Sequence, residues 1–500
     1  MRAKTGVLLL HVLVAAVALV TAGCTVGPNY QIPAVHVPTA YQAAAKPVTT
    51  APAVVSAATQ SATPDLTCWW QTFHDPALNR LIREAVDANL DVRLAATRIR
   101  QARAELEYAQ GALLPTADAS GSYSRSRYSA SEIQAIPGTY DLYQAGFDAG
   151  WEIDVFGGAR RAVEAARDTL QAQTEARRDT LVTLLGEVAQ NYIMLRGYQH
   201  ERQIIEGNIR TQIDTLSLQK RRQRAGVAAD LPIAQAEAQL ESTRAELPVV
   251  ETAIQNAIHR LSVLLDRDVS DLQTELSIEA PIPAGPAELP PGLPSELLRR
   301  RPDIRHAERN LAAATANIGV ATADLYPKFS LLGDVGLGSS RFRSLGNAQS
   351  LFWSIGPSAS WNLFNGGQVR ANIRAKNAME EQAMIQYRQT IIQAVSDVED
   401  AIVAYRQNQI RRDSLRAATT ANRRSLELAR RLNDAGVVDF LNVLDAQQSL
   451  YLTEDQLAQS EQSVSTSLVA LYKALGGGWE MFEESATAPR EHPAVTQDNP

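Results

Sequence analysis

The sequence has few cysteines, no long apolar run beyond its N-terminus and no block of basic residues. Its 500 residues include only Cys24 and Cys68, and no intrachain disulfide is possible if Cys24 carries a lipid. After residue 23, no apolar run reaches the roughly 18 residues of a membrane-spanning helix. Any membrane crossing must therefore be made by β-strands. The formal net charge of -7, without a Lys/Arg-rich segment, argues against a nucleic-acid partner.

Motifs for catalysis are also missing. The seven histidines are scattered and show neither an H-E-x-x-H motif nor a two-His metal spacing. No Walker loop, G-x-S-x-G elbow or dinucleotide fingerprint occurs. Gly333, Gly336 and Gly338 lie in a predicted strand and are followed by two serines, which does not fit a phosphate loop. An enzyme is the main rival class, and these absences argue against it, so we expect no catalytic residue, no metal and no cofactor.

The N-terminus has the pattern of a secretory signal. Two basic residues, an apolar stretch over 6–20 and a short run of small residues precede Cys24. We expect a signal peptide over 1–23 and acylation of Cys24, although Thr21 stands where lipoproteins usually have leucine. Ordinary cleavage or an uncleaved anchor are the alternatives. Thr25 is compatible with sorting to the outer membrane, and Cys68 is expected to be a buried thiol.

The remaining chain consists of two copies of one unit. Trp151 and Trp361 are 210 residues apart, and so are Gly226 and Gly436, each inside an Ala-Gly-Val triplet. Two further matches occur in the same order, which favours duplication over chance. The boundaries we expect are a Pro/Ala/Thr/Val-rich arm over 24–65, a first repeat over 66–280, a Pro-rich linker over 281–294, a second repeat over 295–478 and a tail over 479–500.

Each repeat predicts the same elements in the same order. These are a helix, a strand pair, a very long helix, a glycine break and a last helix. In the long helices, apolar residues recur at alternating steps of four and three, which is typical of coiled-coil packing. The ranges are 116–155, 159–224 and 230–265 in the first repeat, and 329–363, 368–433 and 439–475 in the second.

The strand pairs alternate between an apolar and a polar face. From Tyr143 the odd positions are mostly apolar, and the even positions include Asp148, Glu152 and Asp154. Alternation over about 10 residues is typical of transmembrane barrel strands, although a soluble sheet with one buried face would read the same. In a barrel these three acids would line the lumen, and Trp151 and Trp361 would lie at the membrane interface.

Four strands cannot close a barrel, and an open sheet edge is not tolerated in lipid. Other copies of the chain must then complete the sheet. The long helices also need neighbours to bury their apolar positions. Oligomerisation follows from these arguments, but the number of copies does not.

Several motifs carry a resemblance to a known family. The chain resembles the NodT/TolC-like outer-membrane efflux lipoproteins, which are the outer-membrane components of RND-type tripartite efflux systems. The motifs span nearly the whole mature chain and are Cys24–Pro33, Trp69–Leu78, Trp151–Gly158, Leu293–Arg305 and Val443–Gln447.

The resemblance implies a mainly α fold with a transmembrane β part. The family forms a homotrimer with a 12-strand β-barrel in the outer membrane, four strands per protomer, on a 12-helix periplasmic α-barrel about 100 Å long. It also implies a periplasmic adaptor, an inner-membrane RND-type pump and a lipid anchor in the outer membrane. Such a duct conducts small toxic compounds passively. A duct for protein export by type I secretion and a coiled-coil lipoprotein without a pore are the alternatives.

The same resemblance assigns roles at the periplasmic end. The two glycine breaks become the tips where an adaptor docks, formed by Gly226 with Val227 and Gly436 with Val437. Asp445 matches an acidic position of the periplasmic gate, and Asn442 replaces a second one. The aromatic and the arginine of the enterobacterial latch fall on Asn433 and Val438, so that latch is absent and gating must differ in detail.

Overall fold

This computed structural model describes residues 25–35, 38, 40–42, 66–128, 138–226, 229–286, 297 and 299–483. The predicted signal peptide, Cys24, most of the arm, Val227, much of the linker and most of the tail lie outside the described residues. The chain divides into two compact units, which we describe separately. The sheet unit comprises residues 1–34, 97–174 and 306–388, and the helical unit comprises 35–96, 175–305 and 389–500.

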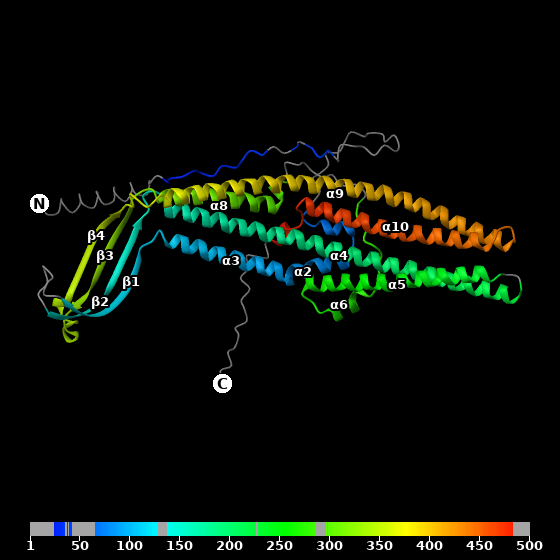
Figure 1. Cartoon of the computed structure of the whole chain (residues 1–500), viewed down its shortest axis with the longest axis horizontal. Helices are drawn as coiled ribbons and strands as arrows, with labels where there is room; N and C mark the ends of the chain where they lie inside the picture. The colour runs from blue at the N-terminus through cyan, green and yellow to red at the C-terminus, as the bar shows by residue number, and fades with distance from the viewer. Residues whose placement is uncertain are drawn as a thin grey trace. The chain divides into compact units, whose positions relative to one another are not determined.

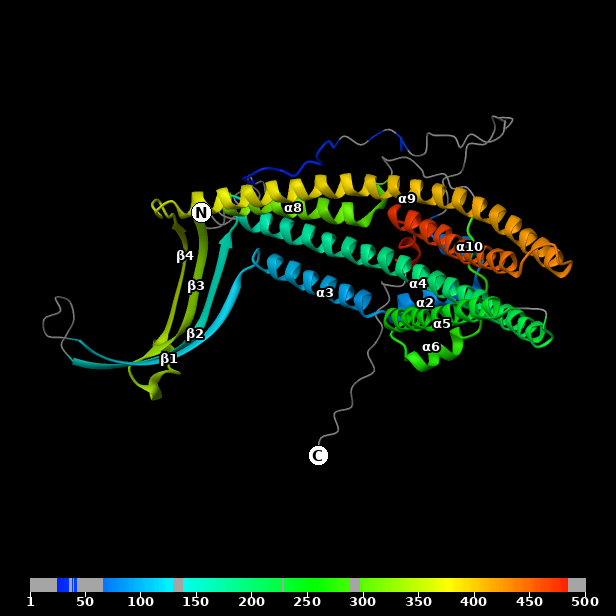
Figure 2. The ribbon, with the colours of Figure 1, turned by 45° about the vertical axis from the view of Figure 1, so that its right-hand side comes forward.

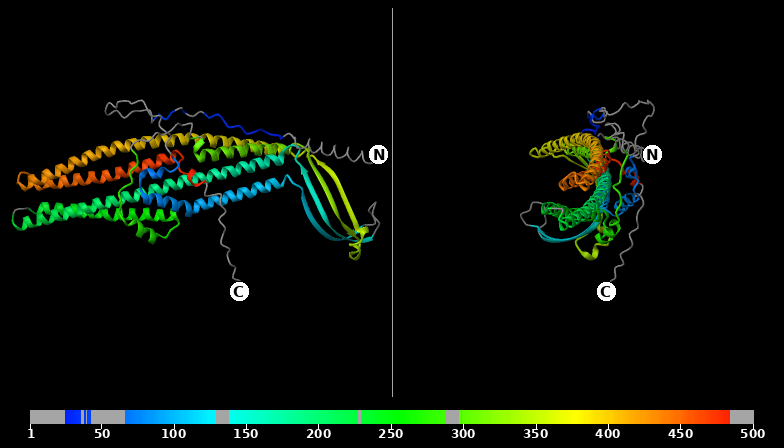
Figure 3. Two further views of the ribbon diagram at one scale, coloured as in Figure 1. Left: turned by 180° about the vertical axis from the view of Figure 1, so that it is seen from behind. Right: turned by 90° about the vertical axis from the view of Figure 1, so that its right-hand side faces the viewer.

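The sheet unit contains one antiparallel sheet with the strand order β1-β2-β3-β4 (Figure 1). Each repeat contributes one hairpin, and β2 pairs with β3 between the repeats. Figure 3 shows the strands side by side as one curved layer. A sheet of four strands per chain in a mainly helical protein confirms the predicted fold class. The strands are β1 (Thr116–Tyr128), β2 (Gly138–Ile153), β3 (Lys328–Ser339) and β4 (Leu351–Ser360).

The β4 strand ends at Ser360, three residues before the predicted end at 363. The chain turns there into the next helix through Gly366 and Gly367, whose φ angles are 59° and 86°. Side chains other than glycine rarely adopt such positive φ values. The strand itself ends at Ser360 because its partner Lys328 is the first residue of β3. Between β3 and β4 lie two short 3-10 helices, η3 (Phe342–Ser344) and η4 (Ala348–Ser350).

Four helices have one end in the sheet unit, and within that unit they all join the same end of the sheet (Figure 2). The connection from β3 to β4 lies at the opposite end of the sheet. The long-helix ranges predicted as 159–224 and 368–433 correspond to α4 and α9. These helices are α3 (Leu90–Gly111), α4 (Gly158–Arg224), α8 (Pro302–Ala323) and α9 (Gln368–Asp434).

The helical unit buries most of the apolar residues that recur at steps of four and three in the long helices. Leu181, Leu185 and Leu195 in α4 are fully buried, and Val398 in α9 is as well. Coiled-coil spacing therefore identified the packed faces of both long helices. In the part of the chain that the structure describes, no helix combines the length and the hydropathy that a membrane span requires. The other elements of this unit are η2 (Trp69–Phe73), α2 (Pro76–Ala88), α5 (Asp230–Leu265), α6 (Val269–Leu276), α10 (Phe440–Ala474) and η5 (Glu480–Phe482).

Aromatic side chains join the start and the end of the chain in the helical unit. Trp69 stacks on Tyr472 with ring centroids 5.0 Å apart, and Trp70 stacks on Phe482 at 5.8 Å. Both tryptophans are about 1% exposed. Cys68 beside them is only half-buried, with its thiol 3.2 Å from a methionine sulfur, so the expectation of a buried thiol is wrong. The thiol lies at the rim of the aromatic cluster.

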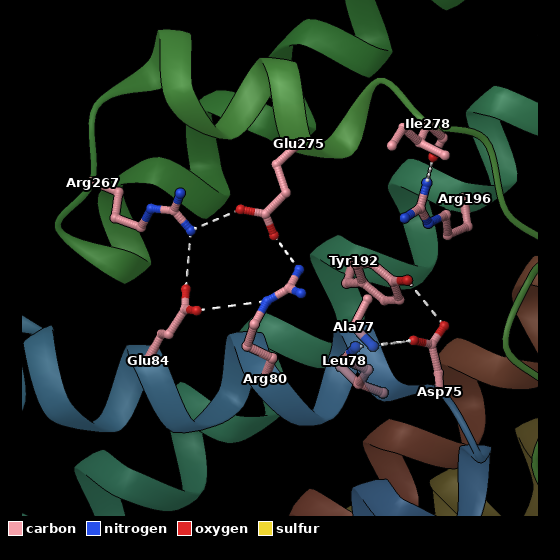
Figure 4. A network of polar contacts seen from close by, with 10 residues as sticks. All are labelled: Asp75, Ala77, Leu78, Arg80, Glu84, Tyr192, Arg196, Arg267, Glu275 and Ile278. Carbon is pink, nitrogen blue, oxygen red and sulfur yellow. Dashed lines mark hydrogen bonds and ion pairs between the residues drawn. The ribbon is translucent and has the colours of Figure 1, made fainter.

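The Asp75-Pro76 pair begins α2 for a clear physical reason. One oxygen of Asp75 accepts hydrogen bonds from the first free backbone N–H groups of the helix, at 2.8 and 3.0 Å, and proline has no N–H to satisfy at this position (Figure 4). The other oxygen accepts the hydroxyl of Tyr192 in α4 at 2.9 Å. Burial raises the pKa of Tyr192 to about 12, so this hydroxyl remains a donor. The motif thus fixes α2 against the first long helix.

A second polar cluster in Figure 4 ties α2 to the α5–α6 connection. Arg267 donates to Glu84 of α2 and to Glu275 of α6, at 3.0 Å each. Arg80 completes the ring through ion pairs with the same two carboxylates. Buried Asn89 separates α2 from α3, because its side chain caps α3 and also donates to a carbonyl in α5. Neither α6 nor this break was predicted.

Candidate functional site

The register of the sheet sorts its side chains onto two faces. Tyr123 lies opposite Tyr143, which lies opposite Ser339, so odd-numbered residues of the first three strands share one face. Leu337 lies opposite Leu351, which extends this face to β4. Large apolar side chains on it remain exposed within one chain: Phe147 is 65% exposed and Trp353 70%. An apolar face without cover needs lipid or protein against it.

The other face carries a row of carboxylates. Asp118, Asp148 and Asp334 are register neighbours on β1, β2 and β3, and Ser354 of β4 continues the row. Ser120 donates to Asp148 at 3.0 Å. Of these acids the sequence pattern had singled out only Asp148, because β1 and β3 alternate less cleanly. On a lumen face this row would favour cations.

The other two predicted lumen acids differ in their surroundings. Glu152 lies on the polar face of β2, opposite Ser330. Asp154 lies past the end of β2, where it accepts hydrogen bonds from the backbone N–H of Arg160 at 2.9 Å and from its guanidinium at 3.1 Å. The placement of Asp154 on the strand face is therefore wrong, since its charge caps the start of α4.

The repeated tryptophans brace the helix–strand junctions. The indole N–H of Trp151 donates to the carbonyl of Leu113, and that of Trp361 donates to the carbonyl of Leu325, both at 3.0 Å. These carbonyls lie just past the ends of α3 and α8. Both rings remain partly exposed, at 37% and 57%. The two equivalent tryptophans thus make equivalent hydrogen bonds in the two repeats. Their location at a membrane interface stays a prediction.

The segment directly after Cys24 is held firmly in the sheet unit. The N–H of Val26 donates to the carbonyl of Phe156 at 3.1 Å. Arg161, which is 3% exposed, donates to the carbonyl of Val26 at 3.2 Å. Gly27 has a φ of 90°, and a Cβ there would lie 2.5 Å from the Cα of Gly319. Cys24 itself lies outside the described residues, but its chain neighbour has a fixed place at the start of α4.

The two predicted tips have the same turn. Gly226 and Gly436 have φ angles of 74° and 73°, in the left-handed region that ends helices. A Cβ at either glycine would meet no atom of the described residues within 4 Å, so the backbone angle selects glycine here. Val437 is 67% exposed, as a docking contact requires. Val227 lies outside the described residues.

The first turns of α10 carry the predicted gate residues. Val443 and Ala446 are buried against Leu426 of α9, and they fix this end of the helix. Asp445 lies between them in sequence and is exposed. Its carboxylate makes no hydrogen bond or ion pair to any residue that the structure describes. Asn442 is also exposed and donates to the carbonyl of Asp439 at 3.3 Å.

A link between the tips was missed by the sequence analysis. Arg222 near the end of α4 donates to Asn433 at 3.0 Å and to Asp434 at 3.3 Å, near the end of α9. Asn433 in turn donates to the carbonyl of Val438 at 3.0 Å. The two positions expected to lack a latch therefore bond to each other. The repeat makes residue 222 equivalent to residue 432, but equivalence between repeats predicts no contact, so the sequence offered no signal for this link.

Three carboxyl groups meet where the helices of the two repeats pack together. Glu201 of α4 and Asp455 of α10 lie beside each other, and the pKa of each carboxyl group is raised, mainly by burial. Glu246 of α5 lies beside them and accepts the hydroxyl of Tyr451. Burial, and then the charges of Asp455 and Glu246, raise the pKa of Glu201 to about 7. In the described residues, no group of His, Cys, Asp and Glu has the arrangement of a metal site.

Comparison with known proteins gives a family. The model of the outer membrane efflux protein family matches residues 81–267 and again residues 293–477, once in each repeat. The toluene efflux pump outer membrane protein TtgC of Pseudomonas putida is 32% identical over 480 residues, covering 95% of this chain and 97% of that protein. The cation efflux system protein CusC of Escherichia coli is 31% identical over 472 residues, covering 93% and 98%.

The solved structures agree. The outer-membrane channel OprN is similar with a TM-score of 0.85 and 34% identity, covering 91% of this chain and 100% of that one. Its similarity extends over both the strands and the helices, since so little of either chain is left out.

Proposed function

The chain belongs to the outer membrane efflux protein family, and on this premise we propose that it is the exit duct of a tripartite efflux pump in the outer membrane. It passively conducts small molecules such as toxic compounds. The relatives named above are efflux components for toluene and for cations, so cargo varies within the family. Substrate choice then belongs to the pump, and the duct supplies a water-filled path.

The exposed apolar sheet face is the observation that carries this proposal. The sheet has open edges at β1 and β4 and a face on which Trp353 and Ile355 are about 70% exposed. Backbone groups at an open edge would be unsatisfied in lipid. Partner copies that pair β4 with β1 remove both problems, and three copies give 12 strands. The polar face with its carboxylate row then lines the lumen.

The remaining parts of the duct follow from the same arrangement. The tips at Gly226 and Gly436 contact a periplasmic adaptor that connects the duct to an inner-membrane RND-type pump. The exposed carboxylate of Asp445 faces its symmetry copies at the gate. A lipid on Cys24 anchors the chain one residue before the segment that Arg161 holds. None of these roles calls for catalysis by the chain.

Conductance of the purified full-length protein in a planar bilayer tests the proposal, together with its mass in detergent. We expect a trimer with a low, cation-preferring conductance that rises when Asp445→Ala removes the carboxylate ring. Glu427→Ala, an exposed carboxylate on α9, is the matched control. A conducting trimer whose conductance is unchanged by Asp445→Ala would support the duct and show that the gate lies at other residues. A monomer without conductance would refute the duct.

A further inference from the structure

The loop end of the sheet carries an aromatic cluster on the apolar face. Tyr123 of β1 and Tyr143 of β2 are register partners with ring centroids 4.7 Å apart. Phe342, in the connection from β3 to β4, packs edge-on against Tyr143 at 5.7 Å. Aromatic side chains at the end of an apolar strand face are typical of the boundary between hydrocarbon and lipid headgroups. The headgroup level therefore begins just past these rings.

Arginines lie directly beyond the aromatic cluster. Arg125 and Arg127 follow Tyr123 at two-residue steps on the same strand and therefore on the same face. Arg341 and Arg343 flank Phe342. Arg125 pairs with its register partner Asp141 at 3.6 Å. The side chains of the other three are exposed and bond to no residue that the structure describes.

The opposite face of β1 shows that the charge on this strand is confined to one side. Its even positions beside the arginines are Ser122, Ser124 and Ser126. A solubilising role would place charge on both faces or toward the lumen. The described charged groups at this end of the sheet, four arginines and one aspartate, instead sum to +3 per chain. Like charges this close repel unless an anion lies between them.

We propose that Arg127, Arg341 and Arg343 bind the phosphate groups of phosphorylated lipid headgroups in the outer leaflet of the membrane. A guanidinium group binds phosphate through two parallel N–H···O bonds, which suits a fixed headgroup better than a mobile counter-ion. The inference rests on the proposed function, because it needs the apolar face to lie in lipid. It adds a lipid site that orients the loop end of the sheet.

Lipid binding to the full-length protein in detergent, followed by native mass spectrometry, tests this site. The probes are diphosphorylated lipid A, the same lipid without phosphates, and inorganic phosphate as a competitor. We expect the triple variant Arg127→Gln, Arg341→Gln, Arg343→Gln to bind diphosphorylated lipid A at least about tenfold more weakly than the wild type. The dephosphorylated lipid should not distinguish the two proteins, and inorganic phosphate should not displace the lipid.

Exposed arginines on α3 and α9 give the matched control. Arg103→Gln with Arg374→Gln should retain wild-type lipid binding. If the triple variant fails to assemble, Arg343→Gln alone, which lies outside the strands, should weaken binding about fivefold. Equal binding by wild type and variants, or displacement by inorganic phosphate, would overturn the lipid site. Conductance of the same samples separates the two claims, since a conducting trimer with unchanged lipid binding refutes this inference alone.

Discussion

The raised pKa of Glu201 beside Asp455 predicts a specific dependence of stability on pH. Glutamate releases its proton near 4.5 in an unfolded chain, whereas burial and the two neighbouring carboxylates raise the pKa of Glu201 to about 7 in the fold. The folded state therefore holds the proton more tightly. Its stabilising contribution is complete below about pH 4.5 and is lost as the pH rises through about 7. Above that pH, two carboxylates repel each other between α4 and α10.

The size of the effect follows from the pKa difference. A shift from 4.5 to about 7 corresponds to at most about 3 kcal/mol per chain. Glu201 is only half-buried, so solvent screening reduces the expected value to about 1 kcal/mol. Among the described residues, the groups that shift the pKa of Glu201 are Asp455, Gln459 and Glu246, and none of them is a cation that would cancel the repulsion.

The assay is urea unfolding followed by circular dichroism at about pH 5 and about pH 8. Glu201→Gln replaces the carboxyl group of this side chain with a neutral amide of the same shape. We expect the wild type to lose about 1 kcal/mol more than this variant between the two pH values. Glu251→Gln, an exposed glutamate on α5, should behave like the wild type. The same pH dependence in wild type and Glu201→Gln would refute the raised pKa of Glu201 in the folded protein.

Three other contacts give direct tests. Arg301 is mostly buried and donates to Asp303 at 2.7 Å, Asp397 at 3.2 Å and the carbonyl of Ala474 at 2.9 Å. Arg301→Met should therefore lower the free energy of unfolding in urea by about 2 kcal/mol. An unchanged urea midpoint would show that these contacts of Arg301 do not stabilise the fold. A Cβ at Gly319 would lie 2.8 Å from the Cγ of Arg161. Gly319→Ala should therefore speed proteolysis near residue 27, whereas Gly346→Ala, with open space around it, should not. Equal proteolysis rates would contradict the packing of the segment around Gly27 against α8. Arg222→Ala removes the link between the tips. A surface ion pair is worth up to about 1 kcal/mol, or about fivefold in an equilibrium, so this variant should raise conductance by up to about fivefold. Arg221→Ala should leave conductance unchanged.

Periodic features could be predicted from the sequence, and contacts between distant residues could not. The heptad positions around Leu185 and the repeat that relates Gly226 to Gly436 are patterns in the chain itself, so they led to the long helices and the tips. Glu201 and Asp455 are far apart in the sequence, and no pattern in the residues that flank either one predicts that they lie side by side. The prediction for Asp154 was wrong for a local reason. The alternation of apolar and polar residues continues past the end of the strand, so the pattern did not distinguish a strand residue from a residue that caps the next helix.

The register of the sheet repeats with the sequence, and this fixes how two copies should pair. Leu325 follows Leu113 by 212 residues, and Trp361 follows Trp151 by 210. With these shifts the pair Asp118–Asp148 of β1 and β2 becomes Ser330–Ser358, which is a register pair of β3 and β4. The pair Asp148–Asp334 between the repeats then becomes Ser358 opposite Ser122 of the partner subunit.

A disulfide cross-link at this position tests the central claim that copies of the chain close the sheet. Cysteines at Ser122→Cys and Ser358→Cys, in a Cys68→Ser background, should join under oxidation, since register partners lie within the roughly 4.5–6 Å between Cα atoms that a disulfide needs. Ser122→Cys with Ser354→Cys, four residues out of register on the same face, is the control. We expect a covalent trimer on a denaturing gel from the first pair and monomers from the second. Monomers from the first pair, or cross-linking only in the second, would contradict closure of the sheet by this route.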